Sequence, residues 1–582
     1  MCGIAGIIKK NNEKVEKSEI NKMLKSIKHR GPDGENIYLD DNIGFGHVLL
    51  KIQDISDASI QPYEYNDLVL CYNGEIYNYK ELREELISKN YSFDTDGDTE
   101  VLIKLLNEYG LDKTLDLIEG CFAFSIYNKK TKTTYIVRDR FGIKPLYYYF
   151  GDNKIIFCSE IKGIIENDGV PRKFNLETVM TSLNCRLWMD PENTLFEGIK
   201  NLTPGCYIKI ENNTMEKIQY YKLEFKNTYK NSDDLIKDFS KEFESSVQKK
   251  LLSKVPVAAF LSGGLDSSIV CKLLSDYSEQ KLSTYTICYD FDNDWDLNHA
   301  EELAQKEKYD QHNILITEDM YNIENIDKVT YAVEEILIDK VYIPMYFNYK
   351  AAKDDGFTVV VSGQGSDEVW LGYIFTWKIF QYIKEKYNKD ILINDYYMSN
   401  MIFKDKINSE NQTSIKGYLK NYLENYFVQD SNDQMNSYGD LSLKTILHDL
   451  LVQEDKIAMI HSVESRVPFV DNHKIVELAY NSSSQIKTFD GREKYIVRKY
   501  SEGKIPDSIV KREKYPVPEP PKIYNGVITK LCKENWEDII NSKLIKKIMN
   551  KELLNDINNF IEVEQWWLLV YWRFENVFKM EV

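Results

Sequence analysis

The sequence predicts an α/β protein built from two large domains, and three observations support this fold class. At 582 residues, the chain exceeds what one hydrophobic core usually serves. Residues 1–210 alternate short β-rich segments with turn residues, which is typical of layered sheets. From about residue 235, apolar runs alternate with helix-length segments, a rhythm that is typical of a parallel sheet with crossover helices.

The first domain is expected to span residues 1–210. Its strand-like segments are residues 2–8, 43–53, 68–74, 121–128, 133–139, 145–150 and 154–160, separated by Gly, Pro, Asn and Asp. Helical patterns intervene at residues 80–89 and 100–109. Many strands with helices between them favour layered α/β sheets over a barrel.

The second domain is expected to span residues 235–582, after a polar linker candidate at residues 227–234. Its strand candidates are residues 255–261, 282–289, 313–316 and 357–361. Beyond about residue 375 the pattern predicts a mostly helical tail. The aromatic run from Trp566 to Trp572 predicts a buried helix, because it is far too short to span a bilayer.

Bulk composition excludes several classes of function. A net charge of −18 argues against a nucleic-acid partner, because neutralising phosphates requires a basic surface. The nine cysteines contain no CxxC pair, which argues against a disulfide framework and a zinc ribbon and favours a reducing cytoplasm. The N-terminus lacks a charged leader followed by an apolar segment, so neither secretion nor membrane insertion is expected.

The first candidate site begins at Cys2, which follows the initiator methionine. Removal of that methionine would leave a thiol beside a free α-amine, which titrates near neutral pH and can take the thiol proton. The motifs HRGPDG (residues 29–34), NGEIYN (73–78) and DGDTEV (96–101) follow in order. The Asn73 side chain and the Gly74 N–H are suitable oxyanion donors, and Glu75 and Asp98 supply carboxylates for a substrate ammonium.

Together with residues 137–149, 157–165 and 194–205, these motifs resemble the glutaminase domain of N-terminal-nucleophile (class II) amidotransferases, in particular the asparagine synthetase family. The resemblance implies an αββα sandwich of the Ntn-hydrolase type. It also implies that Cys2 is the nucleophile and that Asn73 and Gly74 form the oxyanion hole. Glu75 and Asp98 would bind the amino group of glutamine, and Ile52 would line the same pocket.

One position departs from the family pattern. Where the family usually reads HxRLSI, this chain reads HVLLKI, so Leu49 replaces the arginine expected to hold the glutamine α-carboxylate. If the strand continues, Lys51 lies on the same face as Leu49, because side chains two apart face the same way. We predict that the Lys51 ammonium replaces the guanidinium. The alternative, a solvated Lys51 and an enzyme that uses free ammonia, stays open.

The second candidate site is the run SGGLDSS at residues 262–268, placed between an apolar strand and a helix. Glycines and a helix N-terminus form a phosphate cradle. The run resembles the PP-loop of the ATP pyrophosphatases (adenine nucleotide α-hydrolase-like fold), in which ATP is split between its α and β phosphates. The resemblance implies ATP and Mg²⁺, with Asp266 and Asp367 as the magnesium-linked carboxylates. The ATP-binding residues it implies are Phe260, Leu261, Ser262, Gly263, Gly264, Asp266, Ser267, Ser268, Ile287, Ser362 and Gly363.

Two further residues complete the predicted synthetase site. Lys514, in the RxK pattern, would stabilise the charge on an acyl-adenylate. Gln364 replaces the glutamate of asparagine synthetases and would lie near the incoming nitrogen. The implied reaction is hydrolysis of glutamine, passage of ammonia and its attack on an acyl-adenylate, with aspartate as the expected carboxylate and AMP and pyrophosphate as products.

Three alternatives stay open: another carboxylate, such as a uronic acid or a peptide side chain; a ligase that uses an amine, as in β-lactam synthetases; and a non-catalytic paralogue. The sequence does not fix the oligomeric state, and a homodimer is one possible assembly.

Overall fold

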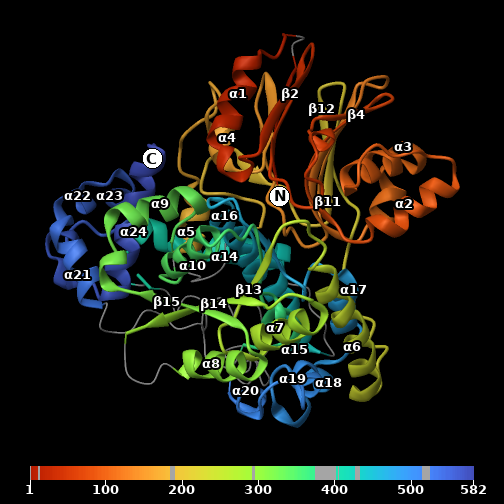
Figure 1. The fold of residues 1–582 in the computed structure, drawn as a ribbon. Helices are drawn as coiled ribbons and strands as arrows, with labels where there is room; N and C mark the ends of the chain where they lie inside the picture. The colour runs from red at the N-terminus through yellow and green to blue at the C-terminus, as the bar shows by residue number, and fades with distance from the viewer. Residues whose placement is uncertain are drawn as a thin grey trace.

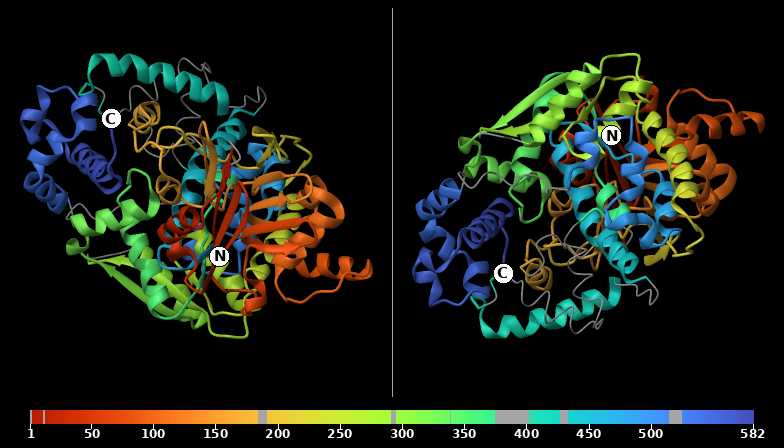
Figure 2. Two further views of the ribbon diagram at one scale, coloured as in Figure 1. Left: turned by 90° about the horizontal axis from the view of Figure 1, so that it is seen from above. Right: turned by 90° about the horizontal axis from the view of Figure 1, so that it is seen from below.

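The computed structural model describes residues 2–10, 13–183, 191–290, 295–337, 339–373, 402–403, 405–426, 433–513 and 525–582. Figure 1 shows a sandwich of strands made by the N-terminal third of the chain, lying against a larger body of parallel strands and helices. In the views from above and below, the C-terminal helices lie at one side of this body (Figure 2).

The N-terminal part contains two six-stranded antiparallel sheets. Their orders are β10-β8-β9-β1-β3-β2 and β12-β11-β7-β6-β5-β4. The strands are β1 (Cys2–Lys9), β2 (Gly34–Asp40), β3 (Ile43–Leu49), β4 (Tyr63–Tyr65), β5 (Leu68–Ile76), β6 (Gly120–Asn128), β7 (Thr133–Arg138), β8 (Tyr147–Phe150), β9 (Lys154–Cys158), β10 (Ile199–Asn201), β11 (Cys206–Glu211) and β12 (Thr214–Gln219).

Helices cover the outer face of each sheet, so that four layers form. On β1, Ile4 and Ile8 point between the sheets, whereas Ala5 and Ile7 pack against α1 (Lys17–Ser26). This alternation follows from the two-residue period of a strand and explains why both faces of β1 are apolar. The second sheet is covered by α2 (Tyr79–Ser88) and α3 (Asp98–Leu117). The predicted αββα sandwich is therefore confirmed.

The second part is built on a five-stranded, fully parallel sheet of order β15-β14-β13-β16-β17. Its strands are β13 (Val257–Phe260), β14 (Ser283–Tyr289), β15 (Asp310–Ile316), β16 (Val359–Val361) and β17 (Glu464–Arg466). The first four match the predicted strands. The sequence did not predict β17, because two of its three residues, Glu464 and Arg466, carry charged side chains within a mostly helical stretch.

Helices cover both faces of the parallel sheet, so apolar side chains of β13 and β16 point into two different cores. The main helices are α6 (Ser232–Lys249), α7 (Leu265–Tyr277), α8 (Trp295–Glu307), α9 (Ile323–Val333), α10 (Tyr342–Asp354), α11 (Ser366–Trp370), α16 (His448–Met459), α17 (His473–Tyr480), α19 (Tyr495–Ser501) and α24 (Glu562–Phe578). Shorter or more peripheral helices are α4 (Ile161–Ile165), α5 (Leu176–Ser182), α14 (Ser409–Tyr426), α15 (Gln434–Ser442), α18 (Ser484–Lys487), α20 (Asp507–Lys511), α21 (Asn525–Glu534), α22 (Trp536–Asn541) and α23 (Lys543–Ile548).

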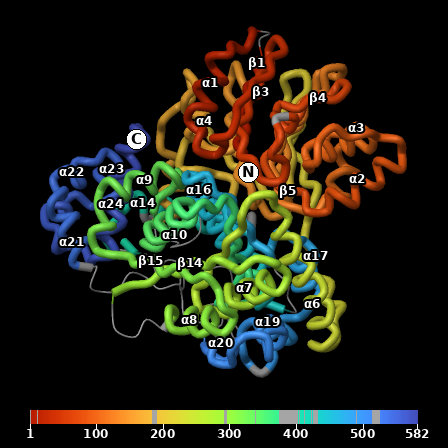
Figure 3. The backbone as a smooth tube through the Cα atoms, in the orientation of Figure 1, coloured from red at the N-terminus to blue at the C-terminus, as the bar shows by residue number. Residues whose placement is uncertain are grey.

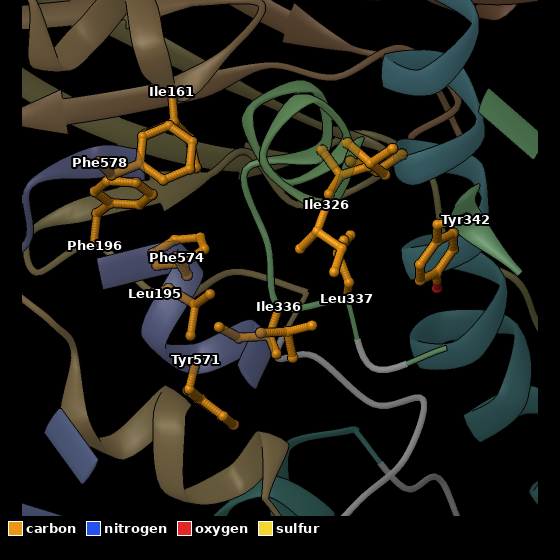
Figure 4. Close-up of a cluster of buried hydrophobic side chains, with 14 of the residues drawn as sticks. Ile161, Leu195, Phe196, Ile326, Ile336, Leu337, Tyr342, Tyr571, Phe574 and Phe578 are labelled. Carbon is orange, nitrogen blue, oxygen red and sulfur yellow. The ribbon is translucent and has the colours of Figure 1, made fainter. Parts of the chain in front are cut away.

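The C-terminal helix α24 joins the two parts through a shared hydrophobic cluster (Figure 4). The centroid of its Phe574 ring lies 5.8 Å from the ring centroid of Phe174 and 5.5 Å from that of Phe196, both in the N-terminal part. The Tyr571 hydroxyl lies 2.5 Å from the Ser182 hydroxyl. The predicted buried helix is confirmed, and among the described residues no helix is long and apolar enough to cross a membrane.

Buried ion pairs also join the two parts. Each charge is compensated, because an isolated buried charge would be strongly destabilising. The network contains Arg30, Lys144, Glu160 and Lys162 from the N-terminal part, and Glu334, Asp455 and Lys456 from the second. Because these pairs are nearly inaccessible to solvent, they fix how the two parts sit against each other.

Candidate active sites

Cys2 and Asn73 meet where the two antiparallel sheets converge. Cys2 begins β1 in one sheet, whereas Asn73 lies on β5 in the other. The Cys2 backbone N–H donates to Asn73 Oδ1 at 3.0 Å. The start of β1 lies in the middle of the molecule, beside β5 (Figure 3). Burial raises the pKa of the Cys2 thiol, so the thiol is protonated at neutral pH and needs a base to become a nucleophile.

Asn73 and Gly74 offer the donors that an oxyanion needs. The Asn73 side chain is fully buried, and its Nδ2 has no hydrogen-bond partner among the described residues. An unpaired buried donor is costly unless a ligand uses it. Gly74 is required by close packing, since a Cβ there would lie 2.2 Å from the Cys121 carbonyl oxygen. The structure thus brings Cys2, Asn73 and Gly74 together as predicted.

Glu75 and Asp98 lie at the same end of β5. Asp98 begins α3 and accepts hydrogen bonds from the Tyr72 hydroxyl at 2.7 Å and the Ile76 N–H at 2.9 Å. Glu75 accepts a hydrogen bond from Gln53 Nε2. Burial raises the pKa of both carboxyl groups, and the charge of Glu464 raises that of Glu75 further. Two buried carboxylates make a site that a substrate ammonium would stabilise.

The segment around Leu49 differs from the prediction. Leu49 is the last residue of β3, where it pairs with Cys2 and is 6% exposed. The predicted strand extended to residue 53, but regular pairing ends at Leu49. The argument that placed Lys51 on the Leu49 face is therefore wrong, and the role of Lys51 stays a prediction. The Lys51 N–H donates to Asp33 Oδ2 at 2.9 Å, and Ile52 packs against Leu50, Val359 and Met459.

The phosphate loop follows β13 as predicted. Gly263 has φ +72°, and a Cβ there would lie 2.1 Å from the Asp296 carbonyl oxygen, so only glycine fits. The Ser262 and Ser267 hydroxyls lie 2.9 Å apart, which closes the loop on itself. Gly264 is the N-cap of α7, so the first N–H groups of the helix have no partner within it. The N–H groups of Leu265, Asp266 and Ser267 can therefore bind an anion.

The loops after β13 and β16 touch each other. A Cβ on Gly363 would lie 2.7 Å from the Ser267 nitrogen, so the two loops pack backbone to backbone. Both follow parallel strands, and such strands place their carboxyl ends at one edge of the sheet. Phe260 and Ile287 are half-buried near this edge, whereas Leu261 is fully buried and its N–H donates to the Tyr285 carbonyl at 3.0 Å. Ser268 is also fully buried, with its N–H bonded to the Gly264 carbonyl.

Asp266 and Asp367 meet at a buried lysine that the sequence analysis missed. Lys494 Nζ lies 2.6 Å from Asp266 Oδ2 and 2.8 Å from Asp367 Oδ1, and its side chain is 1% exposed. Lys494 lies just before α19, more than 220 residues from Asp266 in the chain. The motif GREKYIVRKY gave a local signal of repeated charge, but nothing in it indicated two carboxylates as partners.

This carboxylate pair also fits a magnesium ion. Asp266 Oδ1 is buried and makes no hydrogen bond among the described residues, so it can act as a ligand. Within the described part of the chain, no group of three or more His, Cys, Asp or Glu residues is placed to hold a metal. Two carboxylates suit Mg²⁺, which usually keeps its waters and binds phosphate oxygens as well.

Comparisons with known proteins show the family of the chain. A model described as "Glutamine amidotransferase domain" matches residues 1–221, and one described as "Asparagine synthase" matches residues 238–569. The chain is 31% identical over 567 residues to asparagine synthetase (glutamine-hydrolyzing) 1 of Bacillus subtilis, covering 89% of this chain and 87% of that protein. The chain belongs to the asparagine synthase family. It is also 27% identical to asparagine synthetase (glutamine-hydrolyzing) 3 of the same organism, covering 96% of this chain and 94% of that protein.

Arg30 is, after Lys494, a second residue whose role the sequence analysis missed. Its motif, HRGPDG, was recognised, but no function was assigned to the arginine. Arg30 Nε donates to the Cys2 carbonyl at 3.1 Å, while its two terminal nitrogens bind Glu160 and Asp455 at 2.8 Å each. The guanidinium therefore fixes the backbone of Cys2 and contacts α16 of the second domain.

The structure does not test the predicted roles of Lys514 and Gln364. Lys514 lies outside the described residues. Gln364 lies in the loop after β16, where its N–H donates to Ser362 Oγ at 3.4 Å, and its predicted role stays a prediction. Arg512, in the same motif as Lys514, donates to the Gly263 carbonyl at 3.0 Å and pairs with Asp296. This segment of the asparagine synthase family therefore reaches the phosphate loop at least through Arg512.

Proposed function

We propose that this protein makes asparagine from aspartate, ATP and the amide nitrogen of glutamine. The observation that carries the proposal is that one chain holds both a buried thiol beside an unpaired amide donor and a phosphate loop whose two carboxylates meet at a lysine. Neither site alone implies coupled amide synthesis, but together they supply the nitrogen and the activated acid.

At the first site, removal of Met1 would make the Cys2 nitrogen an α-amine. That nitrogen lies 3.0 Å from Asn73 Oδ1, which would orient the amine toward taking the thiol proton. The thiolate attacks the glutamine side-chain carbonyl carbon, and Asn73 Nδ2 and the Gly74 N–H stabilise the resulting oxyanion. Ammonia leaves, and water then releases glutamate from Cys2.

At the second site, a carboxylate oxygen of aspartate attacks the α-phosphorus of ATP, and pyrophosphate leaves. The N–H groups at the start of α7 and the Lys494 ammonium stabilise the charge on the departing phosphates. Asp266 and Asp367 would hold Mg²⁺, which when bound neutralises phosphate charge. Ammonia then attacks the acyl carbon of the adenylate, AMP leaves, and asparagine remains.

The proposal also covers the partners, the compartment and the assembly of the enzyme. The net charge of −18 argues against a nucleic-acid partner, and we place the enzyme in the cytoplasm. A homodimer is a possible assembly that light scattering would test.

Isotope labelling tests the proposed reaction directly. With glutamine labelled with ¹⁵N in its amide, plus aspartate and ATP, the label should appear in the amide of asparagine. Other acids, including a uronic acid and a peptide with a carboxylate side chain, serve as parallel substrates. Label transfer to one of these acids in preference to aspartate would overturn the assignment of the acceptor.

A further inference from the structure

Arg466 is a residue of the second domain whose side chain ends in the glutamine site. It lies on β17, the edge strand of the parallel sheet, and its side chain is fully buried. The Arg466 Nη2 atom lies 3.6 Å from Glu75 Oε1 and makes no hydrogen bond among the described residues. The Arg466 carbonyl accepts a hydrogen bond at 3.0 Å from the N–H of Ser362, a predicted ATP-binding residue.

The other donors of Arg466 hold the guanidinium in place. Its Nε donates to Glu464 Oε1 at 2.6 Å, and its Nη1 donates to the carbonyls of Lys250 and Leu252 at 2.7 and 2.9 Å. Three of the four contacts therefore fix the plane of the side chain within its own domain. The remaining nitrogen, Nη2, faces Glu75 across the domain boundary. A lysine side chain is more flexible and would not hold its charge in this position.

We propose that Arg466 is a positioning residue of the glutamine site, whose guanidinium, 3.6 Å from Glu75, favours the ionised form of the carboxylate that receives the α-ammonium of the substrate. This inference rests on the proposed function, because it assumes that glutamine binds beside Cys2. It adds a contribution from the second domain: the glutaminase site is electrostatically incomplete without β17.

The electrostatic balance around Glu75 supports this role. Glu75 is 3% exposed, and an isolated buried carboxylate takes up a proton because burial disfavours the charged form. Burial and the charge of Glu464 raise the pKa of Glu75, whereas Arg466 is the largest contribution that lowers it. Burial alone would lower the pKa of Arg466, but Glu464 and Glu75 raise it, so the guanidinium stays charged throughout the working range.

Other titratable groups face this pair from the neighbouring elements. Those around Glu75 are the terminal amine, Cys2, Tyr72, Tyr79 and Asp98, and those around Arg466 include Tyr77 and Lys250. None of them is replaced by a substitution on β17, although the charge of Glu464 also raises the pKa of Asp98. A change in pH dependence that follows Arg466→Met therefore reports on Glu75, and one that follows Glu464→Gln reports on Glu75 and Asp98 together.

Two substitutions on β17 should move the pH profile in opposite directions. Below the pKa of Glu75 the carboxyl is protonated, so it binds the substrate ammonium weakly and kcat/KM for glutamine falls. Arg466→Met removes the cation and should move this acid limb to higher pH by about 1 to 3 units. Glu464→Gln removes a neighbouring negative charge and should move the limb to lower pH. Arg466→Lys, which keeps the charge, should fall between wild type and Arg466→Met.

The nitrogen source separates this role from a purely structural one. In Arg466→Met, the ratio of glutamine-dependent to ammonium-dependent synthesis should fall, mainly through a higher KM for glutamine. Arg498→Met is the matched control, because Arg498 is also buried in the second domain and donates to the carbonyls of Val510 and Arg512. That substitution should lower both activities alike.

Several results would overturn the proposal. An acid limb that stays at the wild-type pH in both Arg466→Met and Glu464→Gln would do so, as would equal losses with both nitrogen sources. If Arg466→Met does not fold, the downward shift expected for Glu464→Gln still decides the question. A wild-type protein that does not hydrolyse glutamine at any pH would overturn the proposed function together with this inference.

Discussion

The two candidate sites are built in different ways. In the N-terminal site, Cys2, Asn73 and Glu75 lie on strands of two sheets that are fixed by pairing and by a common core. In the second site, Asp266 and Asp367 lie at the starts of helices after parallel strands, and the cation between them comes from a distant segment. The strand-built site takes its predicted residues from short motifs on strands and at a helix start within one domain, whereas the site at the edge of the parallel sheet takes its cation from a segment that only the fold brings near.

The largest expected effect separates the two sites by their nitrogen source. Cys2→Ala removes the nucleophile and should lower glutamine-dependent synthesis more than about a thousandfold. Synthesis from ammonium salts should continue, because the second site does not use the thiol. Amide formation measured with each nitrogen source checks this. Equal losses with both sources would show that the sites do not work separately.

Lys494→Met should be the most damaging change at the second site that leaves the phosphate loop intact. It leaves Asp266 and Asp367 without their shared cation, and we expect pyrophosphate exchange to fall by about 10² to 10³. Lys456→Met is a matched control. Lys456 is equally buried, and its ammonium lies 2.9 Å from the Glu334 carboxylate in the ion-pair network between the two parts of the chain rather than at the phosphate loop. If both variants lost exchange to the same extent, Lys494 would have only a structural role.

Leu49→Arg tests the departure in the first site. A guanidinium beside the glutamine α-carboxylate should lower KM for glutamine by about a hundredfold or more, the size of one restored buried ion pair. Lys51→Ala is measured alongside in steady-state glutaminase assays. Wild-type activity that survives Lys51→Ala would refute the idea that Lys51 replaces the arginine. Negligible wild-type activity that Leu49→Arg restores would indicate an enzyme that uses ammonia.

The smallest expected effect concerns the contact between the two parts of the chain. Tyr571→Phe removes the hydroxyl that lies 2.5 Å from Ser182, and it should lower the free energy of unfolding by about 0.5 to 1.5 kcal/mol. Thermal unfolding of the full chain measures this, with glutamine-dependent and ammonium-dependent synthesis as a second readout. A loss of several kcal/mol would show that the hydroxyl organises more of the interface than its own hydrogen bond.

The sequence predicted most of the fold because apolar periodicity is strong in both parts of the chain. The strands β1, β5 and β6, and the parallel strands β13, β14, β15 and β16, were found from alternation and from continuous apolar runs. Strand β17 was missed because its three residues, Glu464, Ser465 and Arg466, are all polar or charged and carry no such pattern. Strand β3 was predicted too long, since Leu50 and Ile52 are buried by the second domain rather than by strand pairing.

The predicted site residues divide in the same way. Cys2, Asn73, Gly74, Glu75 and Asp98 meet as expected, because their motifs lie on strands of the two facing sheets or at the start of the helix beside them. Lys494 and Arg466 could not be found from spacing, since each acts on a residue more than 220 positions away. The sequence around a buried charged residue does not indicate which distant residue is its partner. Only the packing of the second domain against the first reveals it.

Product stoichiometry tests the central claim most directly, which is that this chain couples glutamine hydrolysis to adenylation of a carboxylate. Wild-type enzyme with glutamine, aspartate and ATP should release glutamate, AMP and pyrophosphate in equal amounts, each equal to the asparagine formed. Formation of ADP and phosphate instead, or AMP released without any amide product, would contradict the account.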